Sequence, residues 1–220
     1  MKKIKMPGEL ALIVAVIINS LGIALMTKSN FGISSISSVP YVFSSAFSIL
    51  SFGTWNYIFQ TILIISLMIL SKKINIGYIF SFLMGLAFGK MIDVHELWIY
   101  FLPDSLMWHI IYFITSFFII AFGICLSNNS MLPIIPTDTF PRDLSAILKK
   151  QYKYIKTTFD ICCLTTTLII SLFILHKVIG VGIGTVICAL TTGKIVSLIQ
   201  SFLDKHVEFY RYILSDSVKV

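Results

Sequence analysis

The sequence carries little charge for its length. Of its 220 residues, 12% are Asp, Glu, Lys or Arg, whereas 57% are hydrophobic. Soluble domains use about 25% charged residues, because charged side chains are needed to cover a surface that faces water. The apolar residues also fall in long runs rather than in amphipathic stripes. This composition excludes an ordinary soluble domain and predicts a protein that lies in a lipid bilayer.

Motifs that carry enzyme chemistry are absent from the sequence. It contains no HExxH, no Gly-x-Ser-x-Gly and no Walker A loop, so we expect no enzyme activity, no cofactor and no ATP-driven pump. Its four cysteines lie in apolar runs without the spacing of metal ligands, so we expect neither disulfides nor a zinc site, and we expect them to act as small packing residues: Cys125, Cys162, Cys163 and Cys188. Asp93, His95 and Glu96 are close enough in sequence to suggest a metal site, but there is no second cluster of ligands, and we expect these residues to be solvated.

Six apolar stretches are long enough, or nearly so, to cross hydrocarbon about 30 Å thick as helices of roughly 17 to 25 residues. They lack the alternation of polar and apolar residues that is typical of membrane-spanning strands. The sequence therefore predicts an all-α integral membrane protein with six transmembrane helices: Leu10 to Met26, Thr54 to Leu70, Ile76 to Ile92, Trp108 to Leu126, Tyr154 to Leu175, and Val178 to Leu203.

Basic residues are distributed unevenly among the loops. Most of the lysines and arginines precede the first stretch, follow the sixth, or lie between the second and third and between the fourth and fifth. Because cationic loops beside short spans stay in the cytoplasm, both termini are predicted to be cytoplasmic. We expect the first apolar stretch to be a retained helix and not a cleaved signal peptide. The net charge of +7 reflects this bias, and no nucleic-acid surface is indicated.

Parts of the sequence are repeated. Leu21 to Ser45 aligns without a gap with Phe122 to Ala146 at an offset of 101, and Ile64 to Lys72 matches Ile169 to Lys177 at seven of nine positions at an offset of 105. A Gly-Lys pair recurs at an offset of 104, at residues 89–90 and 193–194. We predict one membrane domain over residues 1–220, with repeats of about 9–93 and 108–203. Three spans in each repeat predict that the second is inverted relative to the first.

Two segments between predicted spans are too polar or too rich in proline to cross the bilayer. Phe31 to Leu50 is rich in serine and contains Pro40, and its repeat partner, Leu132 to Lys150, contains five charged residues and three prolines. Proline removes a backbone donor and interrupts a helix. We predict broken or re-entrant segments that line a cavity within the protein. The alternative is that they are interfacial loops.

Polar residues in these segments and in the spans are the candidates for binding a substrate or ion. Asp138 follows Pro136 closely, and Asp160 lies deep enough in a span to need a cavity or a partner. Lys194 is a candidate partner of Asp160 or of an anionic ligand group, and a purely structural pair is the alternative. Arg142 is a further candidate, although it could simply pair with Asp143. The full set of candidates is Asp138, Asp160, Lys194, Ser37, Asn56, Arg142 and Lys90.

Four segments resemble the YczE/YyaS/YitT-like family of bacterial membrane proteins: LGIALMTKS at 21–29, FGTWNYIFQ at 52–60, residues 123–143, and VGIGTVICALTTGK at 181–194. The resemblance covers most of the chain and implies a multi-spanning inner-membrane protein. It also implies an aspartate after a Gly- and Pro-containing turn in each half. Asp138 fits this pattern, whereas the first half has Ser37, which departs from it.

These features predict a secondary transporter or exporter of an unidentified small molecule. We expect its site at the middle of the bilayer, between Ser34 to Ser45 and Pro136 to Arg142, together with the third and sixth helices. Asp138 and Asp160 are candidates for proton or cation binding, and Lys194 for holding a negative group. The alternative is an accessory or ligand-binding subunit of another membrane complex that transports nothing alone. The sequence leaves open whether the protein forms a homo-oligomer or binds a membrane partner.

Overall fold

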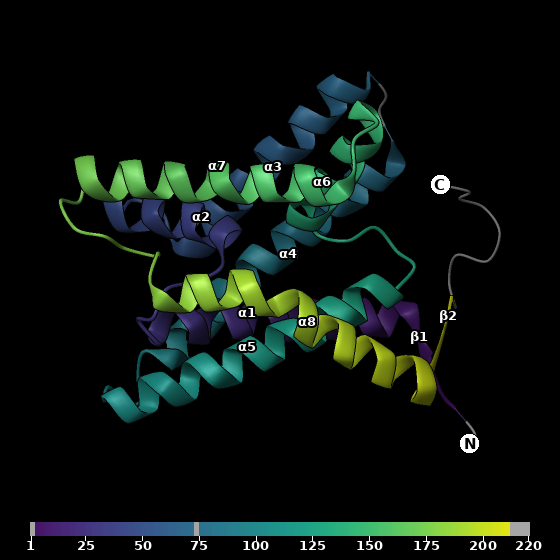
Figure 1. Cartoon of the computed structure of the whole chain (residues 1–220), viewed down its shortest axis with the longest axis horizontal. Helices are drawn as coiled ribbons and strands as arrows, with labels where there is room; N and C mark the ends of the chain where they lie inside the picture. The colour runs from purple at the N-terminus through teal and green to yellow at the C-terminus, as the bar shows by residue number, and fades with distance from the viewer. Residues whose placement is uncertain (1–2, 73–74, 212–220) are drawn as a thin grey trace.

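The computed structural model describes residues 3–72 and 75–211. Over these residues the chain is predominantly helical, with one pair of short strands, and Figure 1 shows how the helices are arranged. The elements in order are β1 (Ile4–Pro7), α1 (Gly8–Lys28), α2 (Ser35–Ala46), α3 (Phe52–Ser71), α4 (Ile76–Ile99), α5 (Leu106–Asn129), α6 (Pro136–Leu148), α7 (Tyr152–Phe173), α8 (Ile183–His206) and β2 (Val207–Tyr210).

Six of these helices are long and apolar enough to cross a membrane: α1, α3, α4, α5, α7 and α8. They confirm the predicted all-α membrane protein with six spans. Two predicted boundaries are wrong. α8 begins at Ile183 and not at Val178, because Gly180 adopts a positive φ of 78° that a right-handed helix does not allow. α4 continues to Ile99, beyond the predicted end at Ile92.

The two polar segments form short helices. α2 has 12 residues and α6 has 13, so at 1.5 Å per residue each reaches only about 20 Å, which is too short to cross the hydrocarbon. The prediction that helical structure breaks at the prolines is wrong. Pro40 and Pro141 lie inside continuous helices, and Pro136 occupies the first helical position, where no backbone N–H is needed.

α1 and α5 form the centre of the bundle and run antiparallel to each other. Glycine allows this close approach, because a Cβ on Gly22 would lie 2.5 Å from Cγ1 of Ile120. In the same way, a Cβ on Gly123 would overlap the side-chain amide of Asn19. Small residues of this kind let membrane helices pack backbone against backbone. Figure 1 shows the crossing pair with α8 lying against α5.

The helices around this centre pack in matching pairs. α4 packs on α1, and α8 packs on α5. α2 packs on α3 and α7, and α6 packs on α7 and α3. One pair departs from this pattern, because α3 packs closely on α4, whereas α7 lies apart from α8 (Figure 1).

The ends of α1 and α5 have the same local structure. The Ser29 hydroxyl donates to the carbonyl of Met26 at 2.6 Å, and the Ser130 hydroxyl donates to the carbonyl of Ser127 at 2.7 Å. The next residue in each case, Asn30 and Met131, has a positive φ of 57°. The aligned repeats therefore end their first helices in the same way.

The strand pair was not predicted from the sequence. β1 precedes α1, β2 follows α8, and the two pair in parallel with Ile4 opposite Val207. Each strand has only 4 residues and no alternating pattern long enough to be recognised. The pairing places the start of α1 and the end of α8 on the same side of the bundle, as Figure 1 shows.

Candidate functional site

A charged pair lies near the middle of α7. Nζ of Lys156 is 2.7 Å from Oδ1 of Asp160 and 2.9 Å from Oδ2, so the ammonium group binds both oxygens of the carboxylate. The two residues are one helical turn apart, which brings their side chains onto the same face of the helix. Both side chains are partly buried. Asp160 is the ninth residue of the 22-residue α7, so this pair lies well inside a candidate span.

The N-terminus of α2 meets this pair. The hydroxyl of Ser35, the first residue of α2, donates to Oδ1 of Asp160 at 2.9 Å. One turn further along α2, the hydroxyl of Ser38 lies 2.8 Å from that of Thr167. α2 therefore begins beside the middle of α7 and runs along it towards its C-terminal end.

α6 approaches the same region of α7 from the other direction. Asp138 is the third residue of α6, and the ring of Phe140 packs on that of Phe159, with 5.0 Å between the centroids. Loss of solvation raises the pKa of the Asp138 carboxyl above its ordinary value of 3.8. The positive charges of Lys156 and Arg142 oppose this rise, and the negative charge of Asp160 adds to it. Asp138 thus shares the electrostatic environment of the charged pair on α7.

The N-termini of two short helices therefore converge on one turn of α7. Figure 1 shows α2 along one half of α7 and α6 at its other end. N–H groups at both helix starts already donate within the chain, to the Ser34 hydroxyl in α2 and to the Ile135 carbonyl in α6. The Lys156 ammonium favours a negatively charged ligand group, whereas Asp138 and Asp160 offer positions for a proton or cation. We call Ser35, Asp138, Lys156 and Asp160 the α7 site.

A second polar cluster is buried on the far side of the start of α6. Nε2 of Gln60 donates to Oδ1 of Asn56, and both side chains are almost fully buried. Oε1 of Gln60 has no hydrogen-bond partner among the described residues and faces Gly85 of α4, where Pro136 also packs. Asn56 therefore lies close to the N-terminus of α6 but belongs to α3.

The remaining predicted candidates lie outside the α7 site. Ser37 is buried, and its hydroxyl accepts from that of Ser34 at 3.0 Å. Arg142 donates from Nε to Oδ1 of Asp143 at 2.9 Å on an exposed face, as the alternative interpretation predicted. Lys90 on α4 and Lys194 on α8 are exposed.

The predicted pairing of Lys194 with Asp160 is not what the structure shows. Asp160 is paired with Lys156, because a lysine one turn away on the same helix reaches the carboxylate without any long-range packing. α2 and α6 pack on α7. Of the two spans predicted to contribute, α4 contacts α6, where Gly85 lies against Pro136, and α8 leaves Lys194 exposed. The spacing of Lys156 and Asp160 was visible in the sequence and could have indicated their pairing.

Two other residues have roles that the sequence analysis missed. Asp93 on α4 caps the start of α3, since Oδ1 accepts from the backbone N–H of Gly53 at 2.8 Å and Oδ2 accepts from the Ser51 hydroxyl at 2.8 Å. Cys162 is exposed on α7, so the expectation that all four cysteines are packing residues is wrong for this one.

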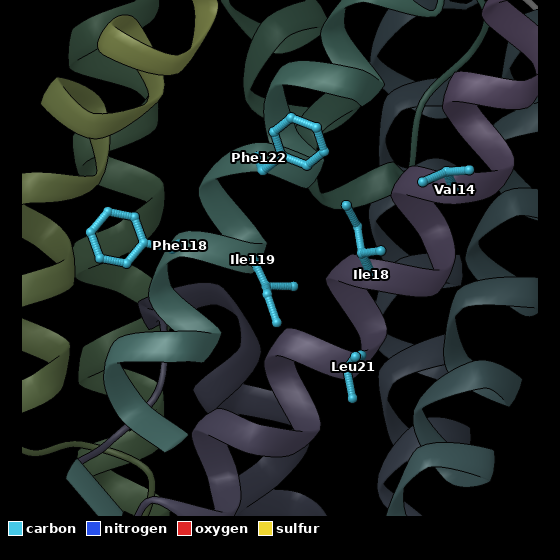
Figure 2. Close-up of a pocket in the computed structure, with 6 residues that line it drawn as sticks. All are labelled: Val14, Ile18, Leu21, Phe118, Ile119 and Phe122. Carbon is cyan, nitrogen blue, oxygen red and sulfur yellow. The ribbon is translucent and has the colours of Figure 1, made fainter. Parts of the chain in front are cut away.

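An apolar hollow of about 340 Å³ lies on the surface between α1 and α5. Figure 2 shows the side chains around it, which are all apolar: Val14, Ile18, Leu21, Phe118, Ile119 and Phe122. A hollow without polar groups cannot orient a polar ligand, so it is separate in chemistry and place from the α7 site. Within residues 3–72 and 75–211, no three His, Cys, Asp or Glu side chains are placed to hold a metal ion.

These features define a multi-pass α-helical membrane protein with a charged centre between two short helices. The chain belongs to the family of unknown function DUF6198, whose family model matches residues 6–201. No curated protein and no solved structure matches the chain. The match does not link the chain to the YczE/YyaS/YitT-like proteins by name, and that resemblance stays a prediction.

Proposed function

We propose that this protein is a secondary transporter or exporter of a small molecule, and that the α7 site binds the molecule or the ion that drives its movement. The observation that carries the proposal is the hydrogen bond from the first residue of α2 to Asp160, beside Asp138 near the start of α6. Helices that end inside a membrane protein with their N-termini directed at a polar centre are typical of secondary transporters.

The proposal also includes two inverted repeats, one covering α1 to α4 and the other α5 to α8. It is supported by the order of long and short helices, which is the same in both halves. It is further supported by the matched packing of α1 on α4 and α5 on α8, and by the matched ends of α1 and α5. A site between such repeats can open to either side of the bilayer in turn.

Asp138 and Asp160 suit proton coupling. A carboxyl group can take up a proton on one side of the membrane and release it on the other when its surroundings change. The raised pKa of Asp138 supports this role, because the carboxyl then binds protons nearer to neutral pH. Energy for transport would come from an ion gradient or from the gradient of the substrate itself, since the sequence has no ATP-binding motif.

The test uses the purified full chain in liposomes that contain a pH-sensitive dye. Amino acids, carboxylates, amines and nucleobases are added outside one at a time. We expect at least one of them to change the internal pH in liposomes with the wild-type protein. Asp138→Asn should abolish the response. Asp143→Asn is the matched control, because Asp143 pairs with Arg142 on an exposed face of the same helix, and it should retain the response. A normal response in Asp138→Asn would refute the role of Asp138.

One observation favours a second candidate function, that of an accessory or ligand-binding subunit. Only 11% of the most apolar part of α8 is buried within the chain, the lowest value among the six candidate spans. A membrane partner could cover this helix. Absence of a pH response to every solute, together with stable co-purification of another membrane protein, would support the subunit and refute the transporter.

A further inference from the structure

α3 and α4 pack against each other through small and aromatic residues. A Cβ on Gly89 would lie 2.5 Å from the backbone oxygen of Gly53 and 3.3 Å from Cβ of Tyr57. The ring of Tyr57 packs on that of Phe82, with 5.2 Å between the centroids. One turn before Gly89, Gly85 lies against the side chain of Gln60. The contact face of α3 is therefore made by residues 53, 57 and 60, and that of α4 by residues 82, 85 and 89.

Within the part of the chain that the structure describes, no helix covers the corresponding face of α7. At the offset of 105 that aligns the ends of α3 and α7, the contact residues of α3 correspond to Thr158, Cys162 and Thr165. All three are exposed. They are small residues, and two of them are polar, although they lie on a helix that is long and apolar enough to span the membrane.

The corresponding face of α8 is also uncovered. At the offset of 104 defined by the repeated Gly-Lys pair, the contact residues of α4 correspond to Val186, Ala189 and Gly193. These residues are exposed as well, and a Cβ on Gly193 would meet no other atom of the described residues within 4 Å. α7 and α8 lie apart in Figure 1. The two faces that correspond to the α3–α4 contact are therefore both uncovered in the second half of the protein.

Resting on the proposed transporter function and its inverted repeats, we infer that α7 packs against α8 in a second conformation, through Thr158, Cys162 and Thr165 on one side and Val186, Ala189 and Gly193 on the other. Small residues drive helix association in lipid because they permit close backbone contact. In the present structure the first repeat is then closed, with α3 packed on α4, and the second repeat is open, with α7 apart from α8. Since α7 carries Asp160, its movement towards α8 changes access to the α7 site.

Differences between the repeats fit this asymmetry. The carboxylate of Asp93 on α4 holds the start of α3 through Gly53 and Ser51. At the offset of 104, the corresponding residue of α8 is Ser197, which has no carboxylate to hold α7 in the same way. The α3–α4 contact is therefore stabilised by hydrogen bonds that the α7–α8 contact lacks, and the second pair is the freer of the two to open and close.

One of the two cysteines needed for a cross-linking test, Cys162, is already present in the sequence. Cys162 corresponds to Tyr57, and Gly193 corresponds to Gly89, whose positions touch in the first repeat. The background is full-length protein with Cys125, Cys163 and Cys188 replaced by alanine. Gly193→Cys is then added, and membranes are treated with copper phenanthroline. The protein is then labelled with a maleimide and run on a gel. A disulfide within one chain is recognised by loss of labelling of the monomer band, which a reductant reverses.

The matched control is Leu198→Cys in the same background. Leu198 is exposed on α8 like Gly193 but lies on a different side of that helix. We expect Gly193→Cys to cross-link to Cys162 about tenfold faster than Leu198→Cys does, because a disulfide requires Cβ atoms about 3.5 to 4.5 Å apart. Equal rates, or no cross-link at Gly193→Cys while both thiols react with maleimide, would overturn the inference. A disulfide-linked dimer would overturn it in favour of a second copy covering α8.

The cross-link separates this inference from the proposed function. Oxidised Gly193→Cys protein in liposomes should lose its solute-dependent pH response and regain it on reduction. Cross-linking without a response under either condition would leave the closure of α7 on α8 established and refute transport. A response that persists without any cross-link would support transport and refute the closure.

Discussion

The hydroxyl of Ser35 on α2 donates a 2.9 Å hydrogen bond to the carboxylate of Asp160 on α7, 125 positions along the chain. This contact fixes the start of a short helix at the middle of a long one. Because Lys156 binds the same carboxylate, a hydroxyl, a carboxylate and an ammonium group are joined at one place. The bond therefore links the first half of the protein to the charged centre of the second half.

Ser35→Ala should weaken this link. Removing a hydrogen bond to a charged group inside a membrane protein is expected to cost about 1 kcal/mol, since Lys156 remains as a partner of Asp160. The melting temperature in detergent should fall, and the solute response in liposomes should decrease. Ser44→Ala is the control, because the Ser44 hydroxyl donates to the carbonyl of Tyr41 within its own helix. Equal melting temperatures for the two variants would contradict the prediction.

Asp138 should make stability depend on pH. Its pKa is raised in the folded protein, so between 3.8 and the folded value the folded protein holds a proton that the unfolded chain has released. The contribution of Asp138 to the free energy of unfolding is therefore fully present below pH 3.8, and it is lost as the pH rises through the pKa of the folded protein. The melting temperature of the wild type, relative to that of Asp138→Asn, should decline with rising pH. If the melting temperature of the wild type instead rose with pH relative to that of Asp138→Asn, the folded protein would stabilise the charged form of this carboxyl.

Two corresponding glycines should respond differently to substitution. Gly89→Ala places a methyl group 2.5 Å from the backbone oxygen of Gly53, so α3 and α4 must move apart, at a cost of about 1–3 kcal/mol. The added methyl group of Gly193→Ala meets no atom of residues 3–72 and 75–211 within 4 Å, and alanine favours the helix by up to about 1 kcal/mol. Unfolding in detergent, followed by circular dichroism, measures both. A destabilised Gly193→Ala would show that its face is already covered in solution.

The orientation of the chain can be tested with single cysteines. We expect both termini in the cytoplasm, which places Lys149 on the cytoplasmic side and Asp104 on the opposite side. In a background without the native cysteines, a membrane-impermeant maleimide should label Asp104→Cys in whole cells, and Lys149→Cys only in opened cells. The reverse pattern would show that the protein inserts with the opposite orientation.

Much of the fold followed from local sequence patterns. Long apolar runs predicted the six spans, because a helix of a given length must match the thickness of hydrocarbon. Prolines and charges predicted that the segments around α2 and α6 do not cross, although the sequence did not show that each would stay helical through Pro40 or Pro141. The end of α8 was predicted closely, whereas its start was misplaced because the positive φ of Gly180 is a property of the folded loop.

The α7 site was only partly predictable. Asp138 and Asp160 stood out, since carboxylates in an apolar segment are costly without a function or a partner. Ser35 did not, because one serine among many gives no signal until α2 packs on α7. Lys156 was not singled out, although it lies one helical turn before Asp160 within the predicted span Tyr154 to Leu175.

The sequence by itself determined the class of protein, the number of spans and the repetition of its two halves, because these depend on composition and on the length of local patterns. Only the tertiary structure decided that α2 and α6 pack on α7, that Asp160 bonds to Ser35, and that α3 packs on α4 while α7 and α8 lie apart. Such choices depend on contacts between residues far apart in the chain. The same local patterns are compatible with several packings, and close contact of particular atoms selects one of them.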